Sequence, residues 1–228
     1  MDSVAFWKDR WIRKPTFSGA MEKTYEAIKV RFLELEKDKT ATLDFSNKTI
    51  LDLGCGRGEI LSWLATEKGC TVMGVEIGKA PVEYLKNEGY EVVCEDVRTV
   101  SLEKKFNIVL CCFVLQHMME EVDVMALYEV ILLHLEDKGM VVLVDKFTSS
   151  NDVKDFNAFC RPLSFHQEIW RRLGLVLVKR TPLIEGKVDP CKFIIVLQKR
   201  KKGRKILCTG QKISCLVDRE ETKHLGKA

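Results

Sequence analysis

Between residues 49 and 173, short apolar runs alternate with longer segments whose apolar side chains recur every three or four positions. Short apolar runs are typical of buried strands, and the longer spacing is typical of helices that bury one face. The predicted strands cover residues 49–53, 71–75, 90–95, 106–112 and 140–144. The predicted helices cover residues 58–68, 79–88, 122–135 and 165–173. This alternation predicts an α/β fold with a mostly parallel sheet.

Two amphipathic segments precede the first strand. Residues 3–13 place Trp7 and Trp11 four positions apart, so the two indoles share one helical face. We interpret both tryptophans as candidate lid residues over a ligand cleft, and docking of this segment on the core is the alternative. Residues 20–37 predict a second helix. Its apolar stripe consists of Tyr25, Ile28, Phe32 and Leu35.

Two apolar runs at 175–180 and 191–197 close the predicted sheet. The Pro- and Gly-containing loop at 182–190 joins them, so they predict an antiparallel hairpin. Residues 147–163 are polar and irregular, and such loops often carry function. Ser164 has the side chain of a helix N-cap for the segment that follows.

The composition fits a globular protein without a membrane span. With 228 residues and 46% apolar side chains, the chain can bury a large core in one domain. No apolar run approaches about 18 residues, and the start lacks the order of a signal peptide. The nine cysteines form no C-x-x-C pair, which predicts reduced thiols, no metal site, and a cytoplasmic or nuclear location.

The charge is concentrated at the end of the chain. Residues 199–228 contain ten Lys or Arg and three Asp or Glu, whereas the rest of the chain has a net charge of −3. A run of this kind predicts a flexible tail, with nuclear import or loose RNA contact as the alternatives. We therefore divide the chain into a helical cap (1–40), a ligand-binding domain (41–198) and a basic tail (199–228).

A glycine-rich turn connects the first predicted strand to its helix. Gly54, Gly56 and Gly58 follow Asp52 in the sequence Leu-Asp-Leu-Gly-Cys-Gly-Arg-Gly. Such a turn lets backbone N–H groups approach a ligand closely. The dinucleotide fingerprint would need another glycine at position 59, where this chain has Glu59. An acid at position 52 suits an amine-bearing ligand better than a pyrophosphate.

Other candidate residues lie where later strands end. Glu76 follows the second strand, 20 residues past Gly56, where a carboxylate binds ribose hydroxyls in doubly wound folds. His117 follows the fourth strand, and either meets a substrate or caps the next helix. Lys138 and Gly139 predict a turn into the fifth strand, after which Asp145 is expected to face the cleft.

The glycine turn, Glu76, Asp96 and the segment Phe113–His117 resemble the Rossmann-like (class I) methyltransferases that use S-adenosylmethionine. This resemblance implies a three-layer fold with a seven-stranded sheet that ends in an antiparallel hairpin. It also implies that Asp96 accepts a hydrogen bond from the adenine amino group, with Glu95 as the competing acid. The residues that the resemblance assigns to the cofactor are Asp52, Gly54, Cys55, Gly56, Gly58, Glu76, Ile77, Asp96, Val97, Cys112 and Phe113.

Two narrower likenesses concern the acceptor. The segments Phe-Trp-Lys, Leu-Gln-His-Met and Cys160-Arg161 resemble protein N-terminal-amine methyltransferases. In that family, a histidine matching His117 and an acid near Asp155 help bind the substrate amine. That family has Asp-Asn where this chain has Lys146-Phe147. The start Trp-Lys-Asp-Arg-Trp and the triplet Val-Glu-Ile around Glu76 resemble thiopurine and related small-molecule methyltransferases.

The sequence therefore predicts an enzyme that moves a methyl group from S-adenosylmethionine to an N, O or S nucleophile. The acceptor is a small molecule or a protein, and nucleic acid is expected to bind only through the tail. His117, Asp145 and Asp155 are the candidates for proton removal, which water can also perform. The alternative is a non-catalytic module that binds the cofactor or a partner, with a basic tail that contacts RNA.

Overall fold

The computed structural model describes residues 6–7, 9–10, 19–41, 43–154, 158–184 and 191–199, and the side chain of Cys191 is not described. The helices are α2 (Gly19–Lys37), α3 (Glu59–Lys68), α4 (Lys79–Asn87), α5 (Glu121–His134) and α6 (Leu163–Arg172), with the 3-10 helix η1 (Leu115–His117). The first strands are β1 (Thr49–Leu53), β2 (Thr71–Glu76), β3 (Glu91–Cys94) and β4 (Phe106–Cys112). The later strands are β5 (Leu135–Phe147), β6 (Val153–Lys154), β7 (Phe159–Cys160), β8 (Leu175–Pro182) and β9 (Cys191–Lys199).

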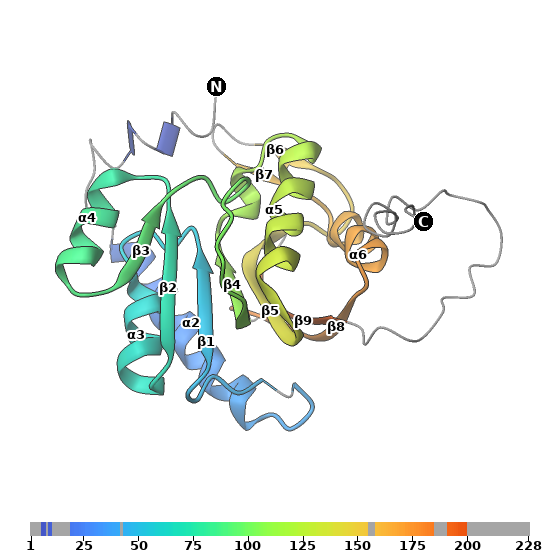
Figure 1. Ribbon diagram of the computed structural model, residues 1–228. Coiled ribbons are helices and arrows are strands. Elements are labelled where there is room, and N and C mark those ends of the chain that lie inside the picture. Colours follow the sequence, from blue (N-terminus) through green and yellow to red (C-terminus); the bar gives the residue numbers. More distant parts are fainter. Residues whose placement is uncertain are drawn as a thin grey trace, which may run out of the picture.

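Seven strands form one sheet in the order β3-β2-β1-β4-β5-β9-β8 (Figure 1). Strands β1 to β5 are parallel, whereas β9 runs antiparallel to both β5 and β8. The predicted mostly parallel sheet with an antiparallel terminal hairpin is confirmed. The order reverses at β1 and β4, and ligands bind beyond the carboxyl ends of strands at such a switch point.

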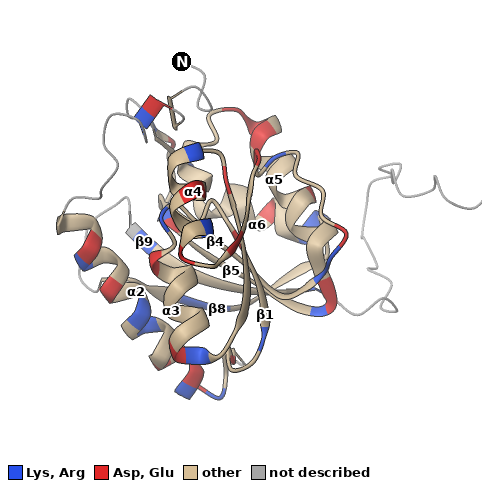
Figure 2. Cartoon of the chain, turned by 60° about the vertical axis from the view of Figure 1, so that its left-hand side comes forward, with Lys and Arg blue, Asp and Glu red and all other residues tan. Residues whose placement is uncertain are grey.

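Helices cover both faces of the sheet, which makes three layers. Helices α2 and α3 pack on one face through a cluster that includes Phe32 and Leu64, and α5 and α6 pack on the other through Tyr128 and Trp170. In Figure 2 the charged residues lie mainly on helices and near strand ends, while the central strands are largely uncharged. That distribution is expected for parallel strands that are buried on both faces. In the described segments, no helix has the length and apolar character that a membrane crossing needs.

The predicted turn at Lys138 and Gly139 is wrong. Strand β5 begins at Leu135, directly after α5, and an irregularity in its pairing with β4 between Phe106 and Ile108 accommodates the extra residues. A Cβ at Gly139 would lie 2.9 Å from the carbonyl oxygen of Asn107. Glycine is therefore needed here for a close approach of two strands, and not for a turn.

Other boundaries also differ from the predictions. Helix α6 begins at Leu163 with Pro162 as its N-cap, so Ser164 lies inside the first turn and does not cap it. The segment predicted to be irregular contains the short hairpin of β6 and β7. Strand β8 reaches Pro182 with an irregularity between Leu177 and Lys179.

Candidate active site

The turn after β1 is bent by three glycines with positive φ. Gly54, Gly56 and Gly58 have φ values of 77°, 56° and 82°, a region that residues with a Cβ rarely adopt. The N–H groups of Gly54 and Cys55 donate to the carbonyl oxygen of Val75, at 2.8 and 3.1 Å. These bonds fix the turn against the end of β2, so that its backbone reaches the same edge of the sheet as Glu76.

Glu76 is a buried carboxylate at that edge, with an exposed fraction of 6%. Its Oε2 accepts the N–H of Gly56 at 3.0 Å, and its Oε1 accepts the N–H of Gly78 at 2.8 Å. These two bonds fix the direction of the carboxylate at the edge of the sheet.

Asp52 lies under the glycine turn and has an exposed fraction of 3%. Its Oδ1 is buried and has no hydrogen-bond partner among the described residues. Burial, reinforced by the charges of Glu76 and Glu59, raises the pKa of Asp52 to about 7. A buried acceptor without a donor costs about 1–3 kcal/mol, so this position favours a ligand that brings a donor or a positive charge.

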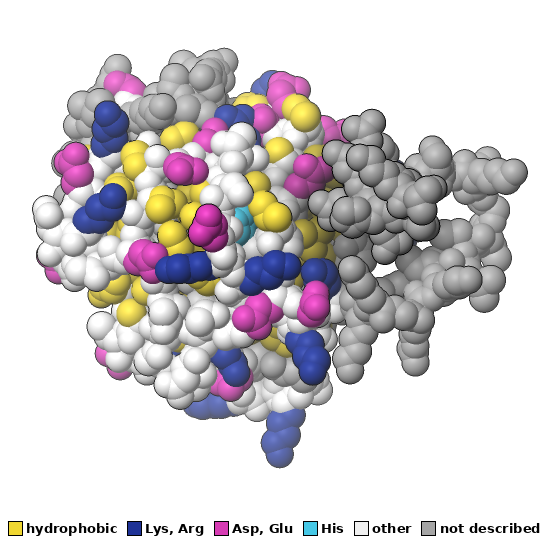
Figure 3. Space-filling view, viewed as in Figure 1, with side chains coloured by type: hydrophobic (Ala, Val, Ile, Leu, Met, Phe, Trp, Pro, Cys, Tyr) yellow, Lys and Arg dark blue, Asp and Glu magenta, His cyan; other side chains and the backbone are white. Residues whose placement is uncertain are grey.

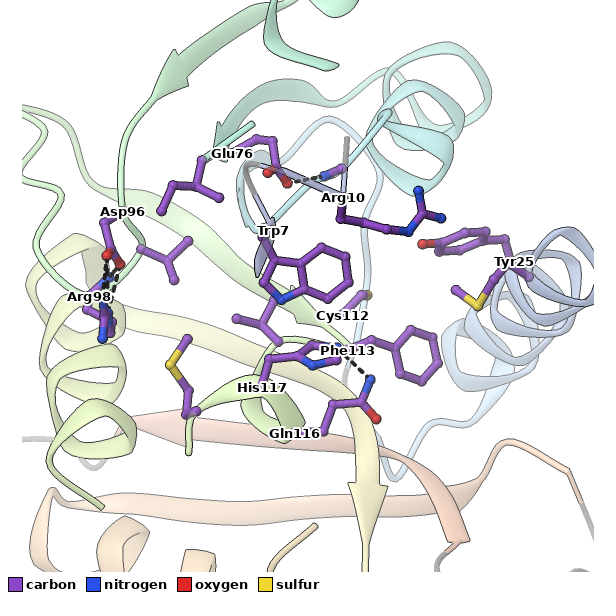
Figure 4. Close-up of a pocket in the computed structure, with 17 residues that line it drawn as sticks. Trp7, Arg10, Tyr25, Glu76, Asp96, Arg98, Cys112, Phe113, Gln116 and His117 are labelled. Atoms are coloured by element: carbon purple, nitrogen blue, oxygen red, sulfur yellow. Dashed lines mark hydrogen bonds and ion pairs between the residues drawn. The ribbon is translucent and has the colours of Figure 1, made fainter. Parts of the chain in front are cut away.

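A cavity of about 270 Å³ opens beside these groups, at the carboxyl ends of β1, β2 and β4 (Figure 4). Its lining comes from the first described residues, α2, the glycine turn, the ends of β2 and β4, the loop after β3, and η1 with the residues beside it. The lining residues are Trp7, Arg10, Met21, Tyr25, Gly54, Gly56, Glu76, Ile77, Asp96, Val97, Arg98, Cys112, Phe113, Val114, Gln116, His117 and Met118.

Most residues predicted from the sequence meet at this cavity. Those that line it are Trp7, Gly54, Gly56, Glu76, Ile77, Asp96, Val97, Cys112, Phe113 and His117. The predicted residues that do not line it are Asp52, Cys55, Gly58 and Asp145. Trp11 and Asp155 lie outside the described residues.

Asp96 is held by its neighbour Arg98. The guanidinium Nε and Nη2 of Arg98 lie 3.0 Å from Oδ1 and 2.6 Å from Oδ2 of Asp96, and Nη1 donates to Asp123 at 2.6 Å. This fork ties the loop after β3 to the first turn of α5 and fixes the carboxylate at the cavity wall. The competing acid, Glu95, is exposed and does not line the cavity.

The chain leaves β4 through Phe113, which has a φ of 57°. A bulky residue in this region costs about 1–3 kcal/mol and is found chiefly where function requires the turn. The N–H of Phe113 donates to the carbonyl oxygen of Val144 at 2.7 Å, and the ammonium of Lys192 lies 5.3 Å from its ring centroid. This turn directs η1, with Gln116 and His117, toward the cavity.

His117 lies between an aromatic ring and an amide. Its ring centroid is 4.6 Å from that of Trp7 in an edge-to-face arrangement, and its Nε2 is 3.0 Å from Nε2 of Gln116. Gln116 has an exposed fraction of 8%, and its Oε1 has no hydrogen-bond partner in the described chain. The two side chains therefore form a polar wall on the side of the cavity opposite Glu76 (Figure 4).

Asp145 does not face the cleft as predicted. Its exposed fraction is 0%, and β5 continues past it to Phe147 because β9 pairs with these positions. Its carboxylate instead accepts the N–H of Lys146 at 2.7 Å and that of Gln116 at 3.4 Å. Burial raises the pKa of Asp145 to about 7, against the effect of these hydrogen bonds.

Sequence reasoning missed seven lining residues: Arg10, Met21, Tyr25, Arg98, Val114, Gln116 and Met118. Tyr25 belonged to the predicted stripe of α2, but its stripe position alone indicates packing. Gln116 lies next to His117 in the sequence, and Arg98 lies two positions after Asp96. Their closeness to these predicted residues is the sequence feature that could have indicated them. Arg10 and Met21 carry no signal, because only the fold brings their helices to the cavity.

Comparison with known proteins finds a family model that matches the central part of the chain. Residues 50–139 match the family model described as "Methyltransferase domain". The ubiquinone biosynthesis O-methyltransferase of Pseudomonas paraeruginosa is 32% identical over 87 residues, which are 35% of this chain and 37% of that protein. A putative methyltransferase of Invertebrate iridescent virus 6 is 32% identical over 75 residues, 31% of this chain and 28% of that protein. The matched part spans about a third of the length of these curated relatives.

Solved structures extend the likeness to most of the chain. Magnesium protoporphyrin IX methyltransferase from Synechocystis, solved with bound S-adenosylmethionine, has a TM-score of 0.65 at 14% identity and covers 88% of this chain and 98% of its own. An O-methyltransferase of a Brevibacillus brevis polyketide synthase, in complex with S-adenosylhomocysteine, has a TM-score of 0.61 at 16% identity, with coverages of 83% and 78%. The family model thus matches residues 50–139, and the chain as a whole has the Rossmann-like α/β fold that these solved methyltransferases share.

Proposed function

We propose that the protein is an S-adenosylmethionine-dependent methyltransferase that acts on an N, O or S nucleophile of a small molecule or a protein. The observation that carries this proposal is the buried carboxylate of Glu76, oriented by two backbone N–H groups beside the glycine turn. A carboxylate held in this way after the second strand of a doubly wound fold suits a pair of ribose hydroxyls. The family match and the cofactor-bound structural neighbours support the same assignment.

The donor and acceptor groups of the site fit this cofactor. The buried Oδ1 of Asp52 lacks a donor among the described residues, and Asp52 does not line the cavity. It lies in the strand that ends just before the cavity-lining Gly54, and we propose that the α-amino group of the methionine part supplies that donor there. Asp96, oriented by Arg98, would accept from the adenine amino group, and Ile77 and Val97 give the base apolar neighbours. When bound, the cofactor supplies an electrophilic methyl group on a sulfonium, so the protein needs no separate activation of that carbon.

The wall opposite Glu76 would hold the acceptor. We propose that His117 and Gln116 orient the nucleophile and hold its proton. The apolar rings of Trp7, Tyr25 and Phe113 would exclude water from the site. Asp145 is not available for contact with the acceptor, because it lies behind η1 with no exposed surface. Asp155 stays a prediction from the sequence.

Charge and cysteine usage bear on the partners and the location that we propose. On the face shown in Figure 3, the described basic and acidic side chains are interspersed, so any contact with nucleic acid is assigned to the tail. In the described part of the chain, no disulfide is formed by Cys55, Cys70, Cys94, Cys111, Cys112 or Cys160. Free thiols are usual in a reducing compartment, and we therefore propose a cytoplasmic or nuclear location.

Transfer of label from S-adenosylmethionine tests the proposal. The full chain is incubated with methyl-labelled cofactor and cell extract, and the small-molecule, peptide and RNA pools are then separated. The expected result is label in the small-molecule or peptide pool, and much less label at the same low cofactor concentration when Glu76→Ala replaces the parent. Cofactor binding without label in any pool would contradict the enzyme and favour the non-catalytic module.

A further inference from the structure

The backbone of η1 is held by two buried charged side chains that lie outside the cavity. Behind its start, the carboxylate of Asp145 accepts the N–H of Gln116 through a long hydrogen bond of 3.4 Å. Beyond its end, Nη1 and Nη2 of Arg161 donate to the carbonyl oxygens of Met118 and Met119, at 2.6 and 2.8 Å. The exposed fractions of Asp145 and Arg161 are 0% and 5%, and neither residue lines the cavity.

Both charged residues are tied to the same end of β5. Asp145 belongs to that strand, and the backbone of Arg161 pairs with Thr148, whose N–H donates to the Arg161 carbonyl oxygen at 3.2 Å. The guanidinium also lies 4.2 Å from the ring centroid of Phe159 and 5.4 Å from that of Phe165. The guanidinium that donates to the two carbonyl oxygens is therefore also stabilised by contact with two aromatic rings.

Burial of an arginine costs free energy, so its placement needs a reason. Burial lowers the pKa of Arg161, while Asp152, Glu121, Glu120 and Asp123 act in the opposite direction. The structure gives no ion pair between Arg161 and any of these acids among the described residues. Its closest hydrogen-bond acceptors are the carbonyls that follow His117, and two parallel donors fix a peptide segment in direction as well as in distance.

We propose that Arg161 and Asp145 are positioning residues that set where Gln116 and His117 lie in the acceptor half of the cavity. They act through the backbone of η1, from both of its sides, and do not touch the reacting groups. That this half of the cavity binds the acceptor rests on the proposed function. That the pair positions His117 rests on the contacts alone. The proposed cofactor half lies at the ends of β1, β2 and β3, so we expect the pair to act on the acceptor half.

The test uses Arg161→Lys and Arg161→Met, with Arg172→Met as the matched control. Lysine keeps the charge but cannot meet two carbonyls with a planar fork, and Arg172 lies on the exposed face of α6 in an ion pair with Glu168. The first readout is the imidazole resonance of His117 in the full chain, assigned with His117→Gln. It reports position because the ring lies 4.6 Å from the indole of Trp7, whose ring current changes steeply with distance.

We expect the His117 resonance to shift or broaden in both Arg161 variants and to stay unchanged in Arg172→Met. Calorimetric titration with S-adenosylhomocysteine is the second readout, and we expect a Kd within about twofold of the parent in every variant. Acceptor labelling in extract should fall in Arg161→Met and recover in part in Arg161→Lys. An unchanged His117 resonance, or a loss of cofactor affinity that parallels the loss of labelling, would overturn the assignment.

Asp145→Asn provides a second variant with the same shape as the parent residue. An amide offers one acceptor oxygen, so the N–H of either Gln116 or Lys146 must face an NH₂ group, and the His117 resonance should again shift. Near-UV circular dichroism of each variant establishes that its core is folded. If the parent chain fails to bind S-adenosylhomocysteine, the proposed function is wrong, while the resonance of His117 still decides whether Arg161 and Asp145 position it.

Discussion

The indole of Trp7 meets the imidazole of His117 edge to face, with the ring centroids 4.6 Å apart and the ring planes at 72°. Trp7 precedes α2, whereas His117 ends η1 after the fourth strand, so the start of the chain reaches across the cavity to its polar wall. The contact places an intrinsic fluorophore between the proposed cofactor and acceptor halves of the site.

We therefore expect S-adenosylhomocysteine to change the tryptophan fluorescence of the protein. Trp7→Phe should abolish most of this change, because the ligand alters the surroundings of the indole that lines the cavity. Trp63→Phe is the control, since Trp63 packs against Phe32 of α2 and does not line the cavity. A ligand response that survives Trp7→Phe and disappears in Trp63→Phe would contradict this placement.

Glu76→Ala should weaken cofactor binding by about 1–3 kcal/mol, which corresponds to roughly a 5- to 150-fold rise in Kd for S-adenosylhomocysteine. The variant removes the charged acceptor and leaves the N–H groups of Gly56 and Gly78 without their partner. Glu95→Ala is the matched control, because Glu95 is an exposed acid after the next strand. Calorimetry of the three proteins measures the effect, and equal Kd values for all three would remove the ribose assignment.

Asp52→Asn should change how stability depends on pH. The folded pKa of about 7 lies above the unfolded value of 3.8, so the folded state binds the extra proton and the parent loses stability as pH rises from about 4 to 7. At pH 8 the neutral asparagine should be more stable than the parent by about 2–4 kcal/mol. Urea unfolding without cofactor at pH 5 and pH 8 measures this difference, which is expected to be much smaller at pH 5.

The same variant should bind S-adenosylhomocysteine more weakly. If Asp52 holds the α-amino group of the ligand, loss of its charge removes a charge-assisted hydrogen bond. Stability and affinity would then move in opposite directions at pH 8. An Asp52→Asn protein that gains stability and keeps its affinity would show that the acid serves another purpose.

His166 should produce the opposite dependence on pH. It is 3% exposed, its Nδ1 is 3.0 Å from the hydroxyl of Tyr128, and burial, followed by the charge of Arg161, lowers its pKa to about 3. The unfolded state takes up a proton near pH 6.5, so this residue makes the protein less stable as pH falls from about 6.5 to 3.

The comparison of His166→Gln with Tyr128→Phe isolates that effect. Both variants change the bond between His166 and the Tyr128 hydroxyl, and Tyr128→Phe also removes the acceptor of the Trp170 indole N–H, but only His166→Gln removes the titrating group. Between pH 7 and pH 4, the stability deficit of His166→Gln relative to the parent should shrink, while the deficit of Tyr128→Phe stays nearly constant. Parallel deficits across this range would show that His166 is protonated in the folded state.

The strands that were predicted best are those marked by a short apolar run. The apolar run Phe106–Cys112 and the segment Thr49–Leu53 are strands with the predicted bounds, because runs of this length are too short for a buried helix. Glu76 and Asp96 were found because the parallel sheet brings its strand ends to one edge. Gly139 and Ser164 were assigned wrongly because the same residue types serve turns, close contacts and caps, and only tertiary pairing decides among them.

The acceptor half was less accessible to prediction. Arg161 and Asp145 reach η1 from segments that follow it by more than one element, and their partners are backbone groups, which have no sequence identity. Tyr25 and Met21 lie on α2, and the apolar stripe of this helix predicts that it packs on the sheet. The stripe does not predict which residues of α2 line the cavity. Such contacts depend on how segments cross in space, which periodicity does not encode.

The interruption of β8 between Leu177 and Lys179 also bears on the behaviour of the protein in solution. An outermost strand presents unpaired N–H and C=O groups that can recruit a strand from another molecule. Here that strand is kinked by the irregularity, carries Lys179 and Arg180, and ends in Pro182, which has no N–H to offer. These features disfavour intermolecular growth of the sheet, so the exposed Val176 and Leu177 can be tolerated at its rim without promoting aggregation.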